Sequence, residues 1–161
     1  MDRTRTGSPG DTDHGCPVNA PHTGPARLDL EVPREFRSLD LIFERMDGLL
    51  ADPRVDARSA YVIRLAIEEL FTNMVKYSPE GHPTISLSMA LENRSMTVRM
   101  VDRGVRPFDV TTAVVPDLEM PMEKRRVGGV GLHLVRSLLD GLEYTHESGQ
   151  TTITLTKNLE R

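Results

Sequence analysis

The sequence predicts an α+β fold in which helices cover one face of a mixed β-sheet. Segments with the two-residue alternation of strands stand beside longer segments with helical periodicity. Their expected order is β-α-α-β-β-loop-α-β, without the regular strand–helix alternation of a parallel doubly wound sheet. No internal repeat is found, so we expect one folded domain from the 161 residues.

The domain is expected to span residues 26–161, after a disordered tail at residues 1–25. The tail is rich in Gly and Pro among Thr, Asp and His, a composition that cannot bury enough surface to offset chain entropy. It lacks the apolar segment of a secretory signal and holds the single cysteine, Cys16. We therefore expect a cytoplasmic protein without internal disulfides.

The overall charge argues against two classes of partner. The formal net charge is −4 at pH 7, which gives no general electrostatic reason to bind nucleic acid or an anionic membrane. No apolar run approaches the roughly 18 residues that a membrane-spanning helix needs. Neither nucleic acid nor a membrane is an expected partner.

The first strand and helix begin after the tail. Leu28, Leu30 and Val32 alternate with polar residues, as in a half-buried strand. Pro33 is then expected to open a helix that ends near Ala51. A second helix is expected from about residue 56 to residue 77. One apolar stripe on it should face the core: Ile63, Ile67, Leu70 and Met74.

The second half of the chain predicts two strands, a loop, a helix and a last strand. Residues 85–89 and 96–100 alternate in the manner of a hairpin. Residues 103–129 show little periodicity and predict a long loop, which in a compact domain is usually functional. Residues 130–142 predict a helix, and a strand around residues 153–155 follows a turn at 148–149.

Three polar residues of the second helix, Glu69, Asn73 and Lys76, share one arc beside the apolar stripe. Such a set is often only a solvated helix surface, with Glu69 and Asn73 as an i,i+4 pair. A carboxylate and an amide oxygen at this spacing can also serve one Mg²⁺ site, where the carboxylate positions or deprotonates a hydroxyl. Lys76 could reach a phosphate as a point charge. The helix alone leaves both interpretations open.

The run from Glu69 to Ser78, ELFTNMVKYS, resembles the N-box of the GHKL superfamily, which includes gyrase, Hsp-type chaperones, sensor histidine kinases and mismatch-repair ATPases. The resemblance covers residues 27–159. It implies a two-layer Bergerat fold with ATP and Mg²⁺ as cofactors. It also implies Asn73 as the metal ligand and Glu69 as the catalytic base.

The second predicted hairpin strand ends in Asp102, with Gly104 two residues later. A carboxylate there can accept a hydrogen bond from the exocyclic amine of adenine, although Asp-x-Gly is also a common turn. Its place after the hairpin is similar to the G1 box of the superfamily, which implies that Asp102 binds adenine and Gly104 shapes the pocket. The continuation Pro107-Phe-Asp109 resembles the anti-sigma-factor serine/threonine kinases.

A glycine cluster precedes the last predicted helix. Glycines at a helix start leave backbone N–H groups free for an anion, although such clusters can also be flexible turns. Here the cluster resembles the G2 box, which implies nucleotide contacts from Gly128, Gly129, Val130, Gly131 and Leu132. The basic run before it is either a solvated charge run or part of a lid, in which Arg125 or Arg126 meets the phosphates.

Within the superfamily, the sequence is most similar to the anti-sigma-factor kinases. This implies an ATP-dependent protein serine/threonine kinase that phosphorylates a STAS-type antagonist in a partner-switching system. A sigma factor is a second implied partner, and a homodimer is consistent with the resemblance. Two alternatives stay open: a nucleotide-gated binding module of weak activity, and a detached histidine-kinase catalytic domain, which the Lys76-to-Gly81 stretch favours.

Overall fold

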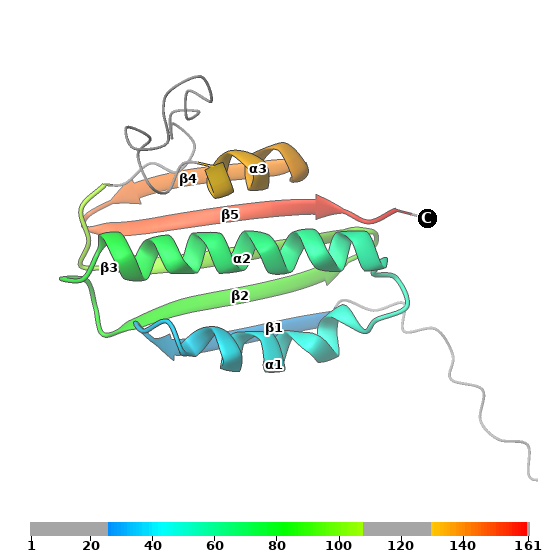
Figure 1. Cartoon of the computed structure of the whole chain (residues 1–161), viewed down its shortest axis with the longest axis horizontal. Coiled ribbons are helices and arrows are strands. Elements are labelled where there is room, and N and C mark those ends of the chain that lie inside the picture. Colours follow the sequence, from blue (N-terminus) through cyan, green and yellow to red (C-terminus); the bar gives the residue numbers. More distant parts are fainter. Residues whose placement is uncertain (1–25, 108–129, 161) are drawn as a thin grey trace, which may run out of the picture.

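The computed structural model describes residues 26–107 and 130–160. These residues form two layers, in which the helices lie on one face of a twisted sheet (Figure 1). The elements, in chain order, are β1 (Ala26–Pro33), α1 (Ser38–Leu50), α2 (Ala57–Tyr77), β2 (Thr84–Glu92), β3 (Ser95–Arg103), α3 (Val130–Leu138), β4 (Gly141–Glu147) and β5 (Gln150–Asn158). The expected α+β class with helices over one sheet face is confirmed.

The sheet has five strands in the order β1-β2-β3-β5-β4. Every neighbouring pair among them is antiparallel, which corrects the expectation of a mixed sheet. For two of these pairs the reason is local: β2 and β3 form one hairpin and β4 and β5 another, and a tight turn joins only antiparallel neighbours. The β1–β2 and β3–β5 pairs join strands that are separated by helices in the chain. In β3, Asp102 lies directly opposite Thr151 of β5.

The sequence analysis did not predict the strand β4. It predicted a helix as far as residue 142, whereas α3 ends at Leu138 and β4 begins at Gly141. Asp140 takes the chain into the sheet: its N–H donates to Thr156 O, and its carboxylate accepts from Lys157. That hydrogen bond from Lys157, with one from the Asn158 backbone, lowers the pKa of the Asp140 carboxyl. The apolar residues up to Leu142 thus keep helical spacing by coincidence, although the chain has already entered β4. The turn that follows has positive φ at Ser148 and Gly149, as a hairpin turn favours.

The first helix also begins later than expected. Pro33 is the last residue of β1, opposite Thr84, and α1 starts at Ser38. Between them the chain turns, and the backbone N–H of Arg34 donates to Pro83 O at 2.8 Å. The hydroxyl of Ser38 donates back to Pro33 O. Pro33 is tolerated in the strand because β1 lies at the sheet edge.

The core lies between the sheet and the helices α1, α2 and α3, and the predicted apolar stripe of α2 is buried as expected. Asp56 caps the helix, since its Oδ1 accepts from Ser59 N at 2.8 Å. Burial opposes ionisation of this carboxyl, but hydrogen bonds from Ser59 and the Glu160 backbone outweigh burial and lower its pKa to about 2. Asp56 therefore fixes the start of α2 through one short-range bond from Ser59 N and one long-range bond from Glu160 N.

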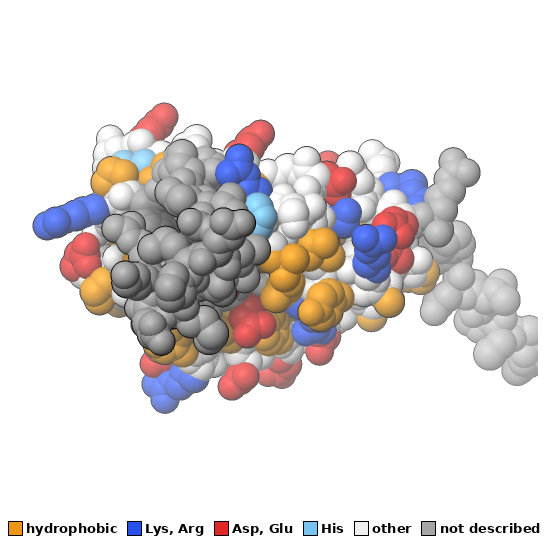
Figure 2. All heavy atoms as spheres, turned by 45° about the horizontal axis from the view of Figure 1, so that its top comes forward, with side chains coloured by type: hydrophobic (Ala, Val, Ile, Leu, Met, Phe, Trp, Pro, Cys, Tyr) orange, Lys and Arg blue, Asp and Glu red, His pale blue; other side chains and the backbone are white. Residues whose placement is uncertain are grey.

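The surface of the described residues mixes charges of both signs. On the face shown in Figure 2, Lys and Arg side chains are interspersed with Asp and Glu rather than gathered by sign. Across residues 26–107 and 130–160, no helix combines the length and the apolar character that crossing a bilayer requires.

Candidate functional site

The C-terminal half of α2 carries the carboxylate and amide that the sequence singled out. Asn73 is buried, and its Nδ2 donates to Glu69 Oε1 at 3.2 Å, one turn earlier. Glu69 is half-buried. Because the amide nitrogen bonds this carboxylate, the amide oxygen Oδ1 points away from it. The pair is thus a directed arrangement rather than a solvated helix surface.

The first turn of α3 lies directly against this pair. A Cβ built on Gly131 would stand only 2.4 Å from Glu69 Oε2, so the Glu69 carboxylate occupies the space that any side chain at this position needs. The neighbouring Leu132 is only 2% exposed and packs into the core. Gly131 therefore allows the N-terminus of α3, with its backbone N–H groups, to approach the carboxylate.

The predicted aspartate lies at the end of β3 and is almost fully buried, with 1% of the residue exposed. It lines a small hollow beneath the C-terminal end of α2. Polar and apolar residues share the wall: Leu70, Asn73, Met74, Ser78, Asp102, Val105, Arg106, Thr151 and Ile153. The volume of the hollow is about 20 Å³, enough for about one water molecule.

Gly104 shapes this end of β3 as expected. Its φ of +69° belongs to the left-handed region, which glycine adopts without strain. The turn lies against the segment before β2, where His82 N donates to Arg103 O at 2.7 Å. Two segments far apart in sequence are thereby joined beside Asp102.

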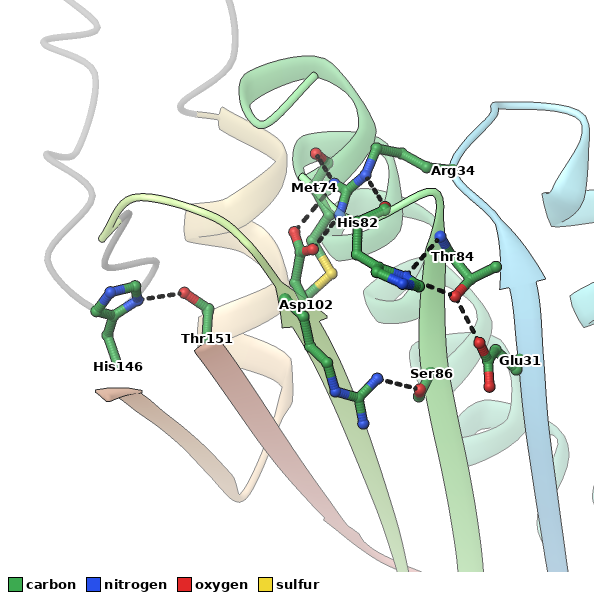
Figure 3. A network of polar contacts seen from close by, with 10 residues as sticks. Glu31, Arg34, Met74, His82, Thr84, Ser86, Asp102, His146 and Thr151 are labelled. Carbon is green, nitrogen blue, oxygen red and sulfur yellow. Dashed lines mark hydrogen bonds and ion pairs between the residues drawn. The ribbon is translucent and has the colours of Figure 1, made fainter. Parts of the chain in front are cut away.

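Asp102 has a buried arginine as its partner, which the sequence did not reveal. Arg34 Nη1 donates to Asp102 Oδ2 at 3.1 Å, and Arg34 Nη2 donates to Oδ1 (Figure 3). Only 6% of the Arg34 side chain and 2% of the Asp102 side chain are exposed. No local pattern points to this pair, because 68 residues separate its members.

Thr151 is the second residue of the site that the sequence analysis missed. It is buried, lines the hollow, and stands opposite Asp102 in the sheet register. Its hydroxyl hydrogen-bonds His146 Nδ1 at 2.8 Å (Figure 3). The available signal was the alternation of Thr residues in the last strand, but its meaning depends on which strand pairs with β3.

The other predicted site residues divide into two groups. Lys76 is exposed, and its Nζ lies 5.1 Å from the centre of the Tyr77 ring, so the structure does not bring it to Glu69 and Asn73. Its phosphate contact stays a prediction. Val130 is described only as the start of α3. Arg125, Arg126, Gly128 and Gly129 lie outside the described residues.

The oxygen donors at this end of α2 suit one cation better than others. In the described part of the chain, no three His, Cys, Asp or Glu residues gather into a metal cluster. Asn73 offers an amide oxygen and Glu69 a carboxylate, the hard donors that Mg²⁺ prefers. Mg²⁺ commonly takes one or two protein ligands and completes its shell with water and phosphate, so this sparse set fits it.

Comparison with known proteins follows this geometry. The histidine kinase-like ATPase domain family matches residues 32–157. The serine/threonine-protein kinase BtrW of Bordetella bronchiseptica is 30% identical over 107 residues, which cover 65% of this chain and 75% of that protein. The serine-protein kinase RsbW of Bacillus cereus is 25% identical over 140 residues, 84% of this chain and 86% of that protein.

A solved structure shows the same fold. The crystal structure of the RsbU and RsbW domains of Rv1364c from Mycobacterium tuberculosis superposes with a TM-score of 0.61 at 19% identity. The match covers 84% of this chain and 32% of that longer chain. The family match spans β1 to β5 and thus every described wall of the site. The chain therefore belongs to the histidine kinase-like ATPase family of the GHKL superfamily, with the RsbW and BtrW serine kinases among its relatives.

Proposed function

We propose that this chain is an ATP-dependent protein serine/threonine kinase of the anti-sigma-factor type, acting in the cytoplasm on a STAS-type antagonist. The observation that carries the proposal is the meeting of Glu69, Asn73 and Gly131 at one end of α2, with Asp102 at the adjoining strand end. The relatives named as serine kinases support the same activity.

The hollow beside Asp102 is the proposed base site. The buried carboxylate accepts from the exocyclic amine of adenine, and the apolar walls of Leu70, Met74 and Ile153 flank the ring. A purine is much larger than the hollow, whose volume is about 20 Å³. The walls of the hollow must therefore move apart when the base enters. Val105 and Arg106 border it at the start of the segment that leads away from β3.

The phosphates extend from the base site toward Glu69. Asn73 Oδ1 is the proposed protein ligand of Mg²⁺, and the bound ion supplies charge neutralisation at the phosphates. The backbone N–H groups at the start of α3 donate to phosphate oxygens. Glu69 orients the hydroxyl of the substrate Ser or Thr and accepts its proton. Most of the rate gain then comes from positioning and electrostatics.

The proposed partners follow from the same assignment. The STAS-type antagonist is the phosphate acceptor, and a sigma factor is the second binding partner, held when the antagonist is phosphorylated. A homodimer is compatible with this role. Arg125 or Arg126, both in the sequence before α3, is proposed to meet the phosphates.

A phosphate-transfer assay tests the proposal. Purified protein is incubated with Mg²⁺, γ-³²P-labelled ATP and a purified STAS-domain protein, the best choice being one encoded beside this chain. Label on a Ser or Thr of the STAS protein is expected. Glu69→Gln should lower the rate by about 10² or more, the usual contribution of a positioned base. Glu68→Gln is the matched control, since Glu68 is the exposed neighbour on the same helix.

The same assay separates the alternatives. ATP binding with no transfer to any STAS protein would support a nucleotide-gated binding module instead. Acid-labile label on a histidine of a helical partner would support a detached histidine-kinase catalytic domain. Equal rates for Glu69→Gln and Glu68→Gln would remove Glu69 from the mechanism.

A further inference from the structure

Arg34 is a buried cation that the proposed mechanism does not use. Besides its two bonds to Asp102, its Nε donates to His82 O at 2.8 Å and its Nη1 to Met74 O at 3.2 Å (Figure 3). The guanidinium is therefore fixed by three separate parts of the fold: the end of β3, the last turns of α2 and the segment before β2. Because the guanidinium is planar and its donors are bonded on several sides, these bonds together allow it one orientation.

Arg34 bonds the Asp102 carboxylate without lining the hollow itself. Asp102 and Met74 line the hollow, whereas Arg34 does not. Each carboxylate oxygen has two lone pairs, so a bond from Arg34 to each oxygen leaves acceptor sites for a ligand. The guanidinium therefore binds the carboxylate without occupying the base site.

The glycine at position 81 provides space for the Arg34 guanidinium. A Cβ placed on Gly81 would stand 2.4 Å from Arg34 Nη2 and 2.7 Å from a methyl of Val105. Any side chain at position 81 would displace the arginine. A lysine at position 34 keeps the charge but cannot reproduce the planar fork that reaches both carboxylate oxygens.

We propose that Arg34 is a positioning residue that holds the Asp102 carboxylate in one orientation, directed into the base site, and thereby sets the selectivity for adenine. The inference rests on the proposed function, because it takes Asp102 as the group that meets the base. A carboxylate fixed by two guanidinium bonds presents acceptors to the base, so it favours the 6-amino group of adenine. It repels the 6-carbonyl oxygen of hypoxanthine, which is also an acceptor.

Without Arg34 the carboxylate would be buried with neither its counter-charge nor its fixed orientation. A buried carboxylate in that state rotates or draws in water, and each change weakens its preference for a donor. The readout is therefore the ratio of affinities for two ligands that differ at this group, ADP and inosine diphosphate. A general loss of stability lowers both affinities and leaves their ratio unchanged.

The test is calorimetric titration of ADP and inosine diphosphate, each with Mg²⁺, into the full chain and its variants. Arg34→Gln is expected to lower the ADP preference about tenfold or more, the range for a hydrogen bond to a charged group. Arg34→Lys is expected to retain an intermediate preference. Arg58→Gln is the control, because Arg58 lies at the opposite end of α2 in an exposed pair with Glu160.

Circular dichroism identifies which variants are folded, and Arg34→Lys supplies the ratio if Arg34→Gln does not fold. An unchanged ratio in a folded Arg34 variant would overturn the inference and leave the kinase proposal standing. A wild-type ratio near one would overturn it as well. Absence of ADP binding by the wild type would instead overturn the nucleotide site, and this inference with it.

Discussion

The two ends of α2 carry an arginine–acid pair each, in opposite environments. Arg34 and Asp102, beside the last turns, are 6% and 2% exposed. Arg58 and Glu160, beside the first turn, are 71% and 55% exposed. Removing an ion from water costs several kcal/mol, whereas an exposed pair contributes about 0–1 kcal/mol. The more deeply buried of these two pairs lies at the end of α2 where the proposed base site is.

The two ends also differ in whether their acidic groups have a local partner. Asp56 at the start of α2 accepts from Ser59 N, three residues away, and also from Glu160 N, 104 residues away. At the other end, Asp102 meets Arg34 across 68 residues, and Glu69 meets Gly131 of another helix. The local bond of Asp56 stabilises the helix wherever it lies, whereas the partners across long stretches of sequence exist only when the whole domain is folded. Four substitutions test this contrast.

The largest effect is expected for Asp102→Ala. It leaves the Arg34 guanidinium buried without its counter-charge, so the free energy of unfolding should fall by about 3–5 kcal/mol. Urea unfolding followed by circular dichroism measures the loss. A loss below about 1 kcal/mol, the range of exposed pairs, would contradict the burial of this pair.

A smaller effect is expected for Gly131→Ala. The added methyl would stand 2.4 Å from Glu69 Oε2, so the flexible, half-buried Glu69 side chain must move away and lose its hydrogen bond from Asn73. Loss of a hydrogen bond to a charged group costs about 1.5–3 kcal/mol, and the helix preference of alanine offsets about 1 kcal/mol of that cost. Gly48→Ala is the matched control, since a Cβ there has nothing within 4 Å. In the interior of α1, alanine should stabilise by about 0.5–1 kcal/mol. Thermal unfolding of both variants gives the comparison, and a shift of the same sign in both would refute it.

Loss of the cap is expected to cost less. Asp56→Ala removes the acceptor for Ser59 and should destabilise by about 1 kcal/mol at neutral pH. The pKa of this carboxyl is about 2, below its ordinary value of 3.8, so its contribution is full above about pH 4 and fades as pH falls through 2. Unfolding of wild type and variant at pH 7 and near pH 2 should therefore show a difference that shrinks in acid. A constant difference would speak against the ionised cap.

The smallest effect is expected for Arg58→Ala. The exposed pair with Glu160 should contribute about 0–1 kcal/mol, and added salt should reduce it further. Urea unfolding at low and high salt checks this. A loss as large as that of Asp102→Ala would remove the contrast between the two ends.

Most elements were predictable because their signals are local. The stripe of α2, the β2–β3 hairpin and the turn at Ser148 and Gly149 follow from periodicity and turn chemistry. The same logic failed at β4, where apolar spacing fits a helix and a strand equally until Asp140 and Lys157 bind across the sheet. The prediction that Pro33 opens a helix was wrong for a similar reason. The fixed φ of proline suits the start of a helix as well as an edge strand, and the pairing of Pro33 with Thr84 places it in the strand.

The sequence by itself determined the family, the α+β class and the positions of Glu69, Asn73, Asp102 and Gly131, because residue type and spacing along one chain carry that information. Only the tertiary structure decided that the Glu69 carboxylate fills the space over Gly131 and that Arg34 donates hydrogen bonds to Asp102. Those contacts depend on strand order and helix packing, which join residues dozens of positions apart. No local pattern encodes such a partner, since its free energy is gained only when every intervening element is in place.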